Sequence, residues 1–176
     1  MKLEIGGGSE AKRRGGDWVN IDLCEGADLQ HDLDVTPWPL ADDSVDEVYS
    51  SHCLEHLSGI KPTFREICRI SKLGSKVEIR VPAPGSHLEF IWTHKHCFSP
   101  IAALNMEHYF PREHWIHAKR MRLDDIIYHS SILLEEAKKE LPFLRDIPDQ
   151  AIMKFLPATC HECCFFYTIV ENEFLP

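Results

Sequence analysis

The sequence predicts an α/β fold, a doubly wound and mostly parallel sheet with flanking helices in a single domain. Three observations predict it. Short runs rich in Val, Ile and aromatic residues, each bounded by Gly, Pro or Asp, recur along the first half of the 176-residue chain. A segment of helical periodicity lies between two of these runs, and a turn of three glycines follows the first. Strand, helix and strand in that order form a parallel crossover, and such sheets bind ligands at the carboxyl ends of their strands.

Four strands are expected in the first half of the chain: "KLEI" at 2–5, "WVNID" at 18–22, "DEVYSS" at 46–51 and "KVEIRVP" at 76–82. A helix is expected between the last two, because apolar residues recur there at helical spacing. These are Ile60, Phe64, Ile67 and Ile70, and Gly74 follows as the expected stop.

The sequence of the second half also predicts alternating helices and strands, but its pattern is less regular. Ser99 is placed as an N-cap with Pro100 at the first helical position, so a helix is expected to begin there. The remaining expected elements are a strand at 120–130, helices at 133–141 and 148–155, and a final strand at 162–172.

Composition excludes several classes of protein. The net charge of −9 argues against a broad surface for nucleic acid or anionic membrane. The longest apolar stretch, Cys163 to Val170, is far shorter than the roughly 18 residues of a membrane span, and the N-terminus lacks a signal-peptide pattern. Seven scattered cysteines argue for a reducing compartment. A cytoplasmic protein is therefore expected.

The cluster "CHECC", residues 160–164, offers thiols and an imidazole close together. A structural zinc site would need a second ligand pair of comparable spacing, and the chain has no second CxxC. We therefore expect Cys163 and Cys164 to open a buried strand, and we expect no metal site.

The glycine turn allows more than one ligand. "GGGSEA" fits the dinucleotide pattern G-x-G-x-x-[GA], with Asp22 as its ribose acid, but Gly6 and Asp22 are only 16 positions apart and no apolar helical face lies between them. A P-loop would need Gly-Lys-Ser/Thr after the turn, which is absent. Another adenosine-containing cofactor is the third candidate for this turn.

Five segments resemble a known family in their order and spacing: "LEIGGG", "VNIDL", "ADLQHDL", "PWPLADDSVDEVYSSHCLEHL" and "KVEIRVP". They resemble the class I S-adenosylmethionine-dependent methyltransferases, which have a Rossmann-like fold, and look most like a small bacterial and phage branch of them. "THKHCFSP" is similar to that branch as well. The resemblance covers about residues 1–98 and implies that 1–98 form a cofactor-binding core, with acceptor-side helices and terminal strands at 99–176.

The resemblance implies the residues that contact S-adenosylmethionine. It places Gly6, Gly7 and Gly8 around the methionine portion, with Glu4 supporting the turn. By position Asp22 accepts from the ribose diol, beside Leu23, although a loop aspartate that ends a strand is the alternative. Asp32 matches the residue that accepts from the adenine amino group, although a turn aspartate is again the alternative. The remaining expected contacts are Leu33 at the adenine ring and Ser51 and His52 at the methyl-transfer mouth.

The expected activity is methyl transfer to a hydroxyl, amine or carboxylate of a small-molecule or glycan-like acceptor. A hydroxyl would need a general base, and His52 and His94 are the candidates because imidazole titrates near neutral pH. Trp92, His94 and Tyr109 are expected to form an aromatic wall of the acceptor site. His56 is expected to pack in a helix, since "HCLEH" lacks the His-Glu adjacency of a zinc protease motif.

Two other classes of function stay open at this point. A NAD-dependent oxidoreductase would use the same sheet, but the short interval to Asp22 and the lack of a recognisable Tyr-Lys pair for hydride transfer speak against it. A binding or regulatory module could keep the cofactor without turnover. We expect no nucleic-acid or membrane partner, and a homodimer remains open.

Overall fold

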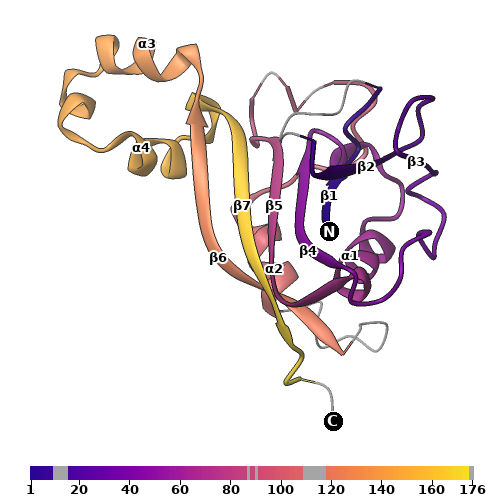
Figure 1. The fold of residues 1–176 in the computed structure, drawn as a ribbon. Helices are drawn as coiled ribbons and strands as arrows, with labels where there is room; N and C mark the ends of the chain where they lie inside the picture. The colour runs from indigo at the N-terminus through magenta and orange to yellow at the C-terminus, as the bar shows by residue number, and fades with distance from the viewer. Residues whose placement is uncertain (10–15, 87, 90, 109–117, 175–176) are drawn as a thin grey trace.

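The computed structural model describes residues 1–176 except 10–15, 87, 90, 109–117 and 175–176. One sheet of seven strands runs through it, in the order β3-β2-β1-β4-β5-β7-β6 (Figure 1). The strands are β1 (Lys2–Ile5), β2 (Trp18–Asp22), β3 (Leu29–Gln30), β4 (Val45–Ser51), β5 (Ser71–Pro82), β6 (Lys119–Ser130) and β7 (Cys160–Glu171).

Four α-helices and three short 3-10 helices connect the described strands. The α-helices are α1 (Ile60–Ile70), α2 (Pro100–His108), α3 (Ile132–Glu140) and α4 (Asp149–Phe155). The 3-10 helices are η1 (Leu54–His56), η3 (Pro142–Asp146) and η4 (Pro157–Thr159). No helix in the described ranges is both long enough and apolar enough to cross a bilayer.

The fold class predicted from the sequence is confirmed. Strands β3, β2, β1, β4 and β5 are mutually parallel, and β7 runs antiparallel to both β5 and β6. The carboxyl ends of β1, β2 and β4 therefore meet at one edge of the sheet, and β7 begins at that same edge because it runs the other way. This topology brings residues from both halves of the chain to one place.

The core follows the apolar pattern of the sequence. Residues on both faces of the central strands are buried, as expected for a parallel sheet covered by helices. Helix α1 buries Phe64, Ile67 and Ile70 as its spacing predicted. Helix α2 begins at Pro100, and the Ser99 hydroxyl accepts from the Ala102 amide at 3.2 Å, so the predicted N-cap is confirmed.

Two details of the prediction are wrong. Gly74 does not stop α1, because the helix ends at Ile70 and β5 begins at Ser71 without a loop. Gly74 lies instead within β5 with φ +84°, in a stretch where the pairing with β4 shifts between Val45 and Glu47. The positive φ of Gly74 therefore accompanies an irregularity in β5 and does not mark the end of a helix. The short β3 also has no counterpart among the expected strands.

The second half forms a long antiparallel pair, β6 and β7, at one side of the sheet (Figure 1). Helices α3 and α4 connect these two strands and lie at their end, on the side away from β1, β2 and β3 (Figure 1). The expected strand and helices of this half are confirmed, although α3 and α4 stand apart from the first three strands.

Candidate active site

The glycine turn Gly6–Gly8 follows β1 directly. The Gly6 amide donates to the Ile21 carbonyl of β2 at 2.9 Å. Gly6 and Gly8 have φ values of +71° and +72°, which side chains rarely tolerate. A Cβ added to Gly6 would lie 2.2 Å from Sγ and 2.4 Å from Cβ of Cys53. Position 6 therefore requires glycine for its backbone and for its close approach to Cys53.

Side chains of β2 hold this turn in place. The Gly7 amide donates to Oδ1 of Asn20 at 3.0 Å, and Nδ2 of Asn20 donates to the Gly8 carbonyl at 2.8 Å. The Gly8 amide donates to Oδ2 of Asp22 at 2.9 Å, and the Cys24 amide donates to Oδ1 of Asp22 at 2.8 Å. The sequence did not single out Asn20. Its position two residues before Asp22, on the same face of a strand, is the signal that could have found it.

Asp22 is a carboxylate suited to a diol. Burial pushes its pKa up, but the hydrogen bonds from the Cys24 and Gly8 amides outweigh burial, and the pKa is lowered. Each carboxylate oxygen has a second lone pair, so a bound ribose can still donate to it. A Cβ on Gly8 would meet no described atom within 4 Å, which leaves open space beside the turn. The residues present therefore fit an adenosine cofactor.

The predicted adenine-side residues follow β2 and β3. The His31 amide donates to the Asp22 carbonyl at 2.8 Å, which places this segment at the same edge of the sheet. Leu23 and Asp32 are exposed. Leu33 is buried in the core, and its carbonyl accepts from the Trp38 indole at 3.1 Å. The contacts of Asp32 and Leu33 with adenine, and the cofactor contact of Leu23, stay predictions.

Ser51 ends β4, and His52 follows it with φ +51°. A non-glycine residue with positive φ is uncommon, and such backbone strain concentrates at functional sites. The His52 amide donates to the Arg80 carbonyl of β5 at 3.0 Å, which fixes the turn. Glu4 lies in β1 between Asn20 of β2 and Tyr49 of β4, and its side chain is buried.

The imidazole of His52 lies between two carboxylates. Its Nε2 is 2.9 Å from Oε2 of Glu162, and its Nδ1 is 3.4 Å from Oε1 of Glu55. The bonds to Glu162 and then to Glu55 raise the pKa of His52 to about 9. His52 is therefore a cation near neutral pH.

Glu55 connects η1 to the segment after β5. Its backbone carbonyl accepts from the amides of Lys95 at 2.7 Å and His96 at 3.2 Å. Its side chain is 1 % exposed, and Oε1 lies 4.0 Å from Nε2 of His94, whose side chain is 7 % exposed. His56 packs edge-on against His94, with ring centroids 4.7 Å apart. The structure therefore brings the two catalytic candidates, His52 and His94, to the same buried carboxylate.

Sequence reasoning missed Glu55 and Glu162. Glu55 could have been found from its i,i+3 spacing to His52. Glu162 is 110 residues away from His52, and only the antiparallel course of β7 explains their contact. Within the cluster 160–164, Cys163 and Cys164 are buried in β7 as expected, and all seven cysteines of the chain are free thiols.

The predicted aromatic wall is wrong for Trp92, whose side chain is fully exposed and so does not pack against His94. Tyr109 lies outside the described residues. His56 belongs to the 3-10 helix η1 and contacts another histidine, so it is more than the helix-packing residue that the sequence suggested.

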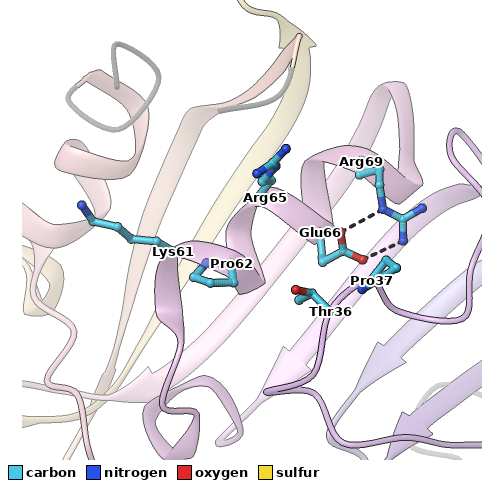
Figure 2. A pocket seen from close by; sticks show the side chains of 7 residues that line it. All are labelled: Thr36, Pro37, Lys61, Pro62, Arg65, Glu66 and Arg69. Atoms are coloured by element: carbon cyan, nitrogen blue, oxygen red, sulfur yellow. Dashed lines mark hydrogen bonds and ion pairs between the residues drawn. The ribbon is translucent and has the colours of Figure 1, made fainter. Parts of the chain in front are cut away.

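A separate cavity of about 450 Å³ lies between α1 and the segment after β3. Figure 2 shows its lining, with Glu66 paired to Arg69. Oε2 of Glu66 also accepts from the Trp38 amide at 2.6 Å, and Arg69 donates to the Leu40 carbonyl at 2.8 Å. These contacts hold the segment before β4 against α1. The ion pair between Glu66 and Arg69 therefore stabilises the fold.

Comparisons with known proteins agree with this geometry. Residues 6–79 match the family model of a methyltransferase domain. No curated protein matches the chain in sequence. The three solved structures described next are each below 25 % identity and support the fold.

An S-adenosylmethionine-dependent methyltransferase from Archaeoglobus fulgidus is 17 % identical, with a TM-score of 0.63 over 95 % of this chain and 85 % of that one. Phosphoethanolamine N-methyltransferase 2 from Haemonchus contortus, in complex with S-adenosyl-L-methionine, is 17 % identical, with a TM-score of 0.57 over 97 % of this chain and 48 % of that one. A chain from the complex of the Haloferax volcanii Trm112 methyltransferase activator with a methyltransferase is 16 % identical, with a TM-score of 0.59 over 97 % of this chain and 82 % of that one.

Residues 6–79 match a methyltransferase domain, and the fold is similar to that of S-adenosylmethionine-dependent methyltransferases, which agrees with the sequence resemblance. The chain is a methyltransferase, and S-adenosyl-L-methionine is its cofactor. The narrower bacterial and phage branch stays a prediction.

Proposed function

We propose that this methyltransferase acts on a hydroxyl group of a small-molecule or glycan-like acceptor, and that His94 accepts the proton of that hydroxyl. The observation that carries the proposal is the position of His94, on the segment after β5, with Nε2 4.0 Å from the buried Glu55 carboxylate. The segments after parallel strands carry the site in this architecture.

The reaction needs little from the protein beyond alignment and one proton acceptor. Bound S-adenosylmethionine would supply the methyl group and keep the electron pair of the broken carbon–sulfur bond on sulfur. The chain itself has to hold the acceptor oxygen in line with that methyl group and to receive the hydroxyl proton on Nε2 of His94. The negative charge of Glu55 stabilises the imidazolium that forms. A carboxylate acceptor would need no base, so this pairing favours a hydroxyl.

His94 suits the role of base better than His52. Both ring nitrogens of His52 face carboxylates, and its pKa of about 9 keeps it protonated near neutral pH. A protonated imidazole has no lone pair with which to accept a proton. We assign His52 to the mouth of the cofactor site, where its charge offsets Glu55 and Glu162.

The cofactor contacts in this proposal are those expected from the sequence. The glycine turn faces the methionine portion, Asp22 accepts from the ribose diol, and Asp32 accepts from the adenine amino group. The hydrogen bonds that Asp22 and Asn20 make to the turn support this arrangement, because they fix the backbone at the place where the cofactor approaches.

The test is His94→Gln, measured with labelled S-adenosylmethionine against panels of alcohols and sugars, amines, and carboxylic acids. We expect turnover on a hydroxyl acceptor to fall by about 10²- to 10⁴-fold, the range for loss of a general base. The dissociation constant for S-adenosylhomocysteine should stay within about twofold of wild type, since the proposal gives His94 no cofactor contact.

His161→Gln is the matched control, because it removes an imidazole at the start of β7 whose Nδ1 contacts the Ser130 carbonyl. It should leave turnover unchanged. Full turnover in His94→Gln, or transfer confined to amines or to carboxylic acids, would contradict the proposal.

A further inference from the structure

We propose that a divalent transition-metal ion binds among Glu55, His56 and His94, beside the cofactor site. Each of the three residues offers one ligand atom, and these atoms all lie within 4.8 Å of one another. The donor set is one carboxylate oxygen and two imidazole nitrogens. Zinc and similar ions use this set when they keep a coordination position open.

The buried carboxylate is the first argument. Glu55 is 1 % exposed, and among the described residues neither of its oxygens has a closer polar partner than Nδ1 of His52, which forms an ion pair with Oε1 at 3.4 Å. A buried carboxylate without partners is costly unless a cation compensates it. His52 lies 3.4 Å from Oε1 but shares its single charge with Glu162, which it contacts more closely at 2.9 Å. Glu162 also has Arg80 at 3.7 Å, so Glu55 is the less well compensated of the two carboxylates, and a metal ion would neutralise it.

The orientation of His56 is the second argument. Its Nδ1 lies 3.2 Å from the Thr93 carbonyl, so Nε2 is the nitrogen available to a ligand. Histidines that bind metals commonly use their other ring nitrogen to donate to a backbone carbonyl, which fixes the tautomer and the ring.

The scaffold around the three residues is the third argument. Glu55 and His56 are neighbours in η1, and the backbone bonds from Lys95 and His96 to the Glu55 carbonyl fix His94 above them. Metal–ligand bonds of about 2.0–2.2 Å put ligand atoms roughly 3–3.5 Å apart. Oε1 of Glu55 and Nε2 of His94 are 4.0 Å apart and all three ligand atoms lie within 4.8 Å of one another, so side-chain movements would have to bring them closer to bind the ion.

A second group in the described part of the chain, His129, Glu162 and Cys164, has a comparable spacing. It is the weaker candidate because Glu162 is already bonded to His52 at 2.9 Å and lies 3.7 Å from Arg80. This second group provides the control for the first.

The metal site goes beyond the proposed function, and the two are tested separately. His94 has a different role in each case, as a ligand when the metal is bound and as a base in the metal-free chain, because an Nε2 that binds a metal has no lone pair left for a proton. Loss of turnover in His94→Gln therefore does not distinguish the two roles, whereas metal binding without cofactor or acceptor does.

The experiment is a titration of the purified full chain with Co²⁺, followed by calorimetry and by the visible spectrum. We expect one Co²⁺ per chain, with a spectrum of nitrogen and oxygen ligands and without a sulfur-to-metal charge-transfer band. Equal concentrations of Mg²⁺ should not displace it, because Mg²⁺ prefers oxygen ligands.

Glu55→Gln and His56→Gln should each weaken Co²⁺ binding by more than about tenfold, at least the loss typical of an altered metal environment. His129→Gln should bind as wild type. Circular dichroism checks the fold of each variant, and His56→Gln carries the test if Glu55→Gln does not fold. Wild-type affinity in His56→Gln, loss of binding in His129→Gln, or a sulfur charge-transfer band would overturn the proposal.

Discussion

Replacing Gly6 by alanine tests the glycine turn at its most constrained point. The substitution adds one methyl group where the backbone has φ +71° and where the new Cβ would lie 2.2 Å from Sγ and 2.4 Å from Cβ of Cys53. Rotation of the Cys53 side chain can move Sγ but cannot move Cβ. The backbone of the turn or of Cys53 must therefore shift.

The cost has two parts. Left-handed backbone in a residue with a Cβ costs roughly 1–2 kcal/mol. Overpacking a buried site costs typically about 1–3 kcal/mol, and Cys53 is 9 % exposed. Gly6→Ala should therefore lower the free energy of unfolding by about 2–5 kcal/mol, and should weaken binding of S-adenosylhomocysteine because the turn moves.

A double-mutant cycle separates the two parts. In urea denaturation, Cys53→Gly removes both clashing atoms, so the double variant should recover about 1–3 kcal/mol relative to the sum of the single changes. The double variant should keep the cost of the left-handed backbone at position 6. A loss below about 0.5 kcal/mol in Gly6→Ala, or strict additivity in the cycle, would refute the reasoning.

Two further predictions concern carboxylates that the structure holds in place. Asp22→Ala should weaken binding of S-adenosylhomocysteine by about 1.5–3 kcal/mol, roughly 10- to 150-fold, because charge-assisted bonds to the ribose are lost; unchanged calorimetric affinity would rule out the ribose contact. Glu66→Gln should cost about 1.5–3 kcal/mol of stability at pH 7, since Glu66 bonds Arg69 and the Trp38 amide. Burial opposes these bonds but is outweighed, so the pKa of Glu66 is lowered. The stabilisation is therefore present above the ordinary carboxyl pKa of 4.5 and is lost as pH falls through the lower folded value. Denaturation curves of both proteins should converge in acid, and a difference that grows toward low pH would contradict this sign.

The parallel half of the fold could be predicted because its signals are local. Each of the runs at 2–5, 18–22 and 46–51 is a short apolar strand next to a turn, and the pattern of α1 is periodic. The end of α1 could not be predicted in the same way. Gly74 resembles a helix stop in sequence, but the pairing of β5 with β4 begins at Ser71 and overrides that local preference.

The candidate site was predictable only in part. Position at the end of a strand was enough to select the glycine turn and Asp22, and the family resemblance added His52. The partners of these residues depend on topology, as the contact between His52 and Glu162 shows, because β7 returns antiparallel to the edge where β4 ends.

Gly6 shows the same limit. From the sequence alone, Gly6→Val is expected to abolish cofactor binding in a protein that still folds. The proximity of Cys53 adds a loss of stability, which no local pattern indicates.

The central claim is that the edge formed by the ends of β1, β2 and β4 binds S-adenosylmethionine. The most direct measurement is a calorimetric titration of the purified chain with S-adenosylmethionine, S-adenosylhomocysteine and NAD. We predict one site per chain for the two sulfur cofactors, with affinity weakened by Asp22→Ala, and no heat of binding for NAD. Binding of NAD, or an affinity for S-adenosylhomocysteine that neither Asp22→Ala nor Gly6→Ala changes, would contradict this claim.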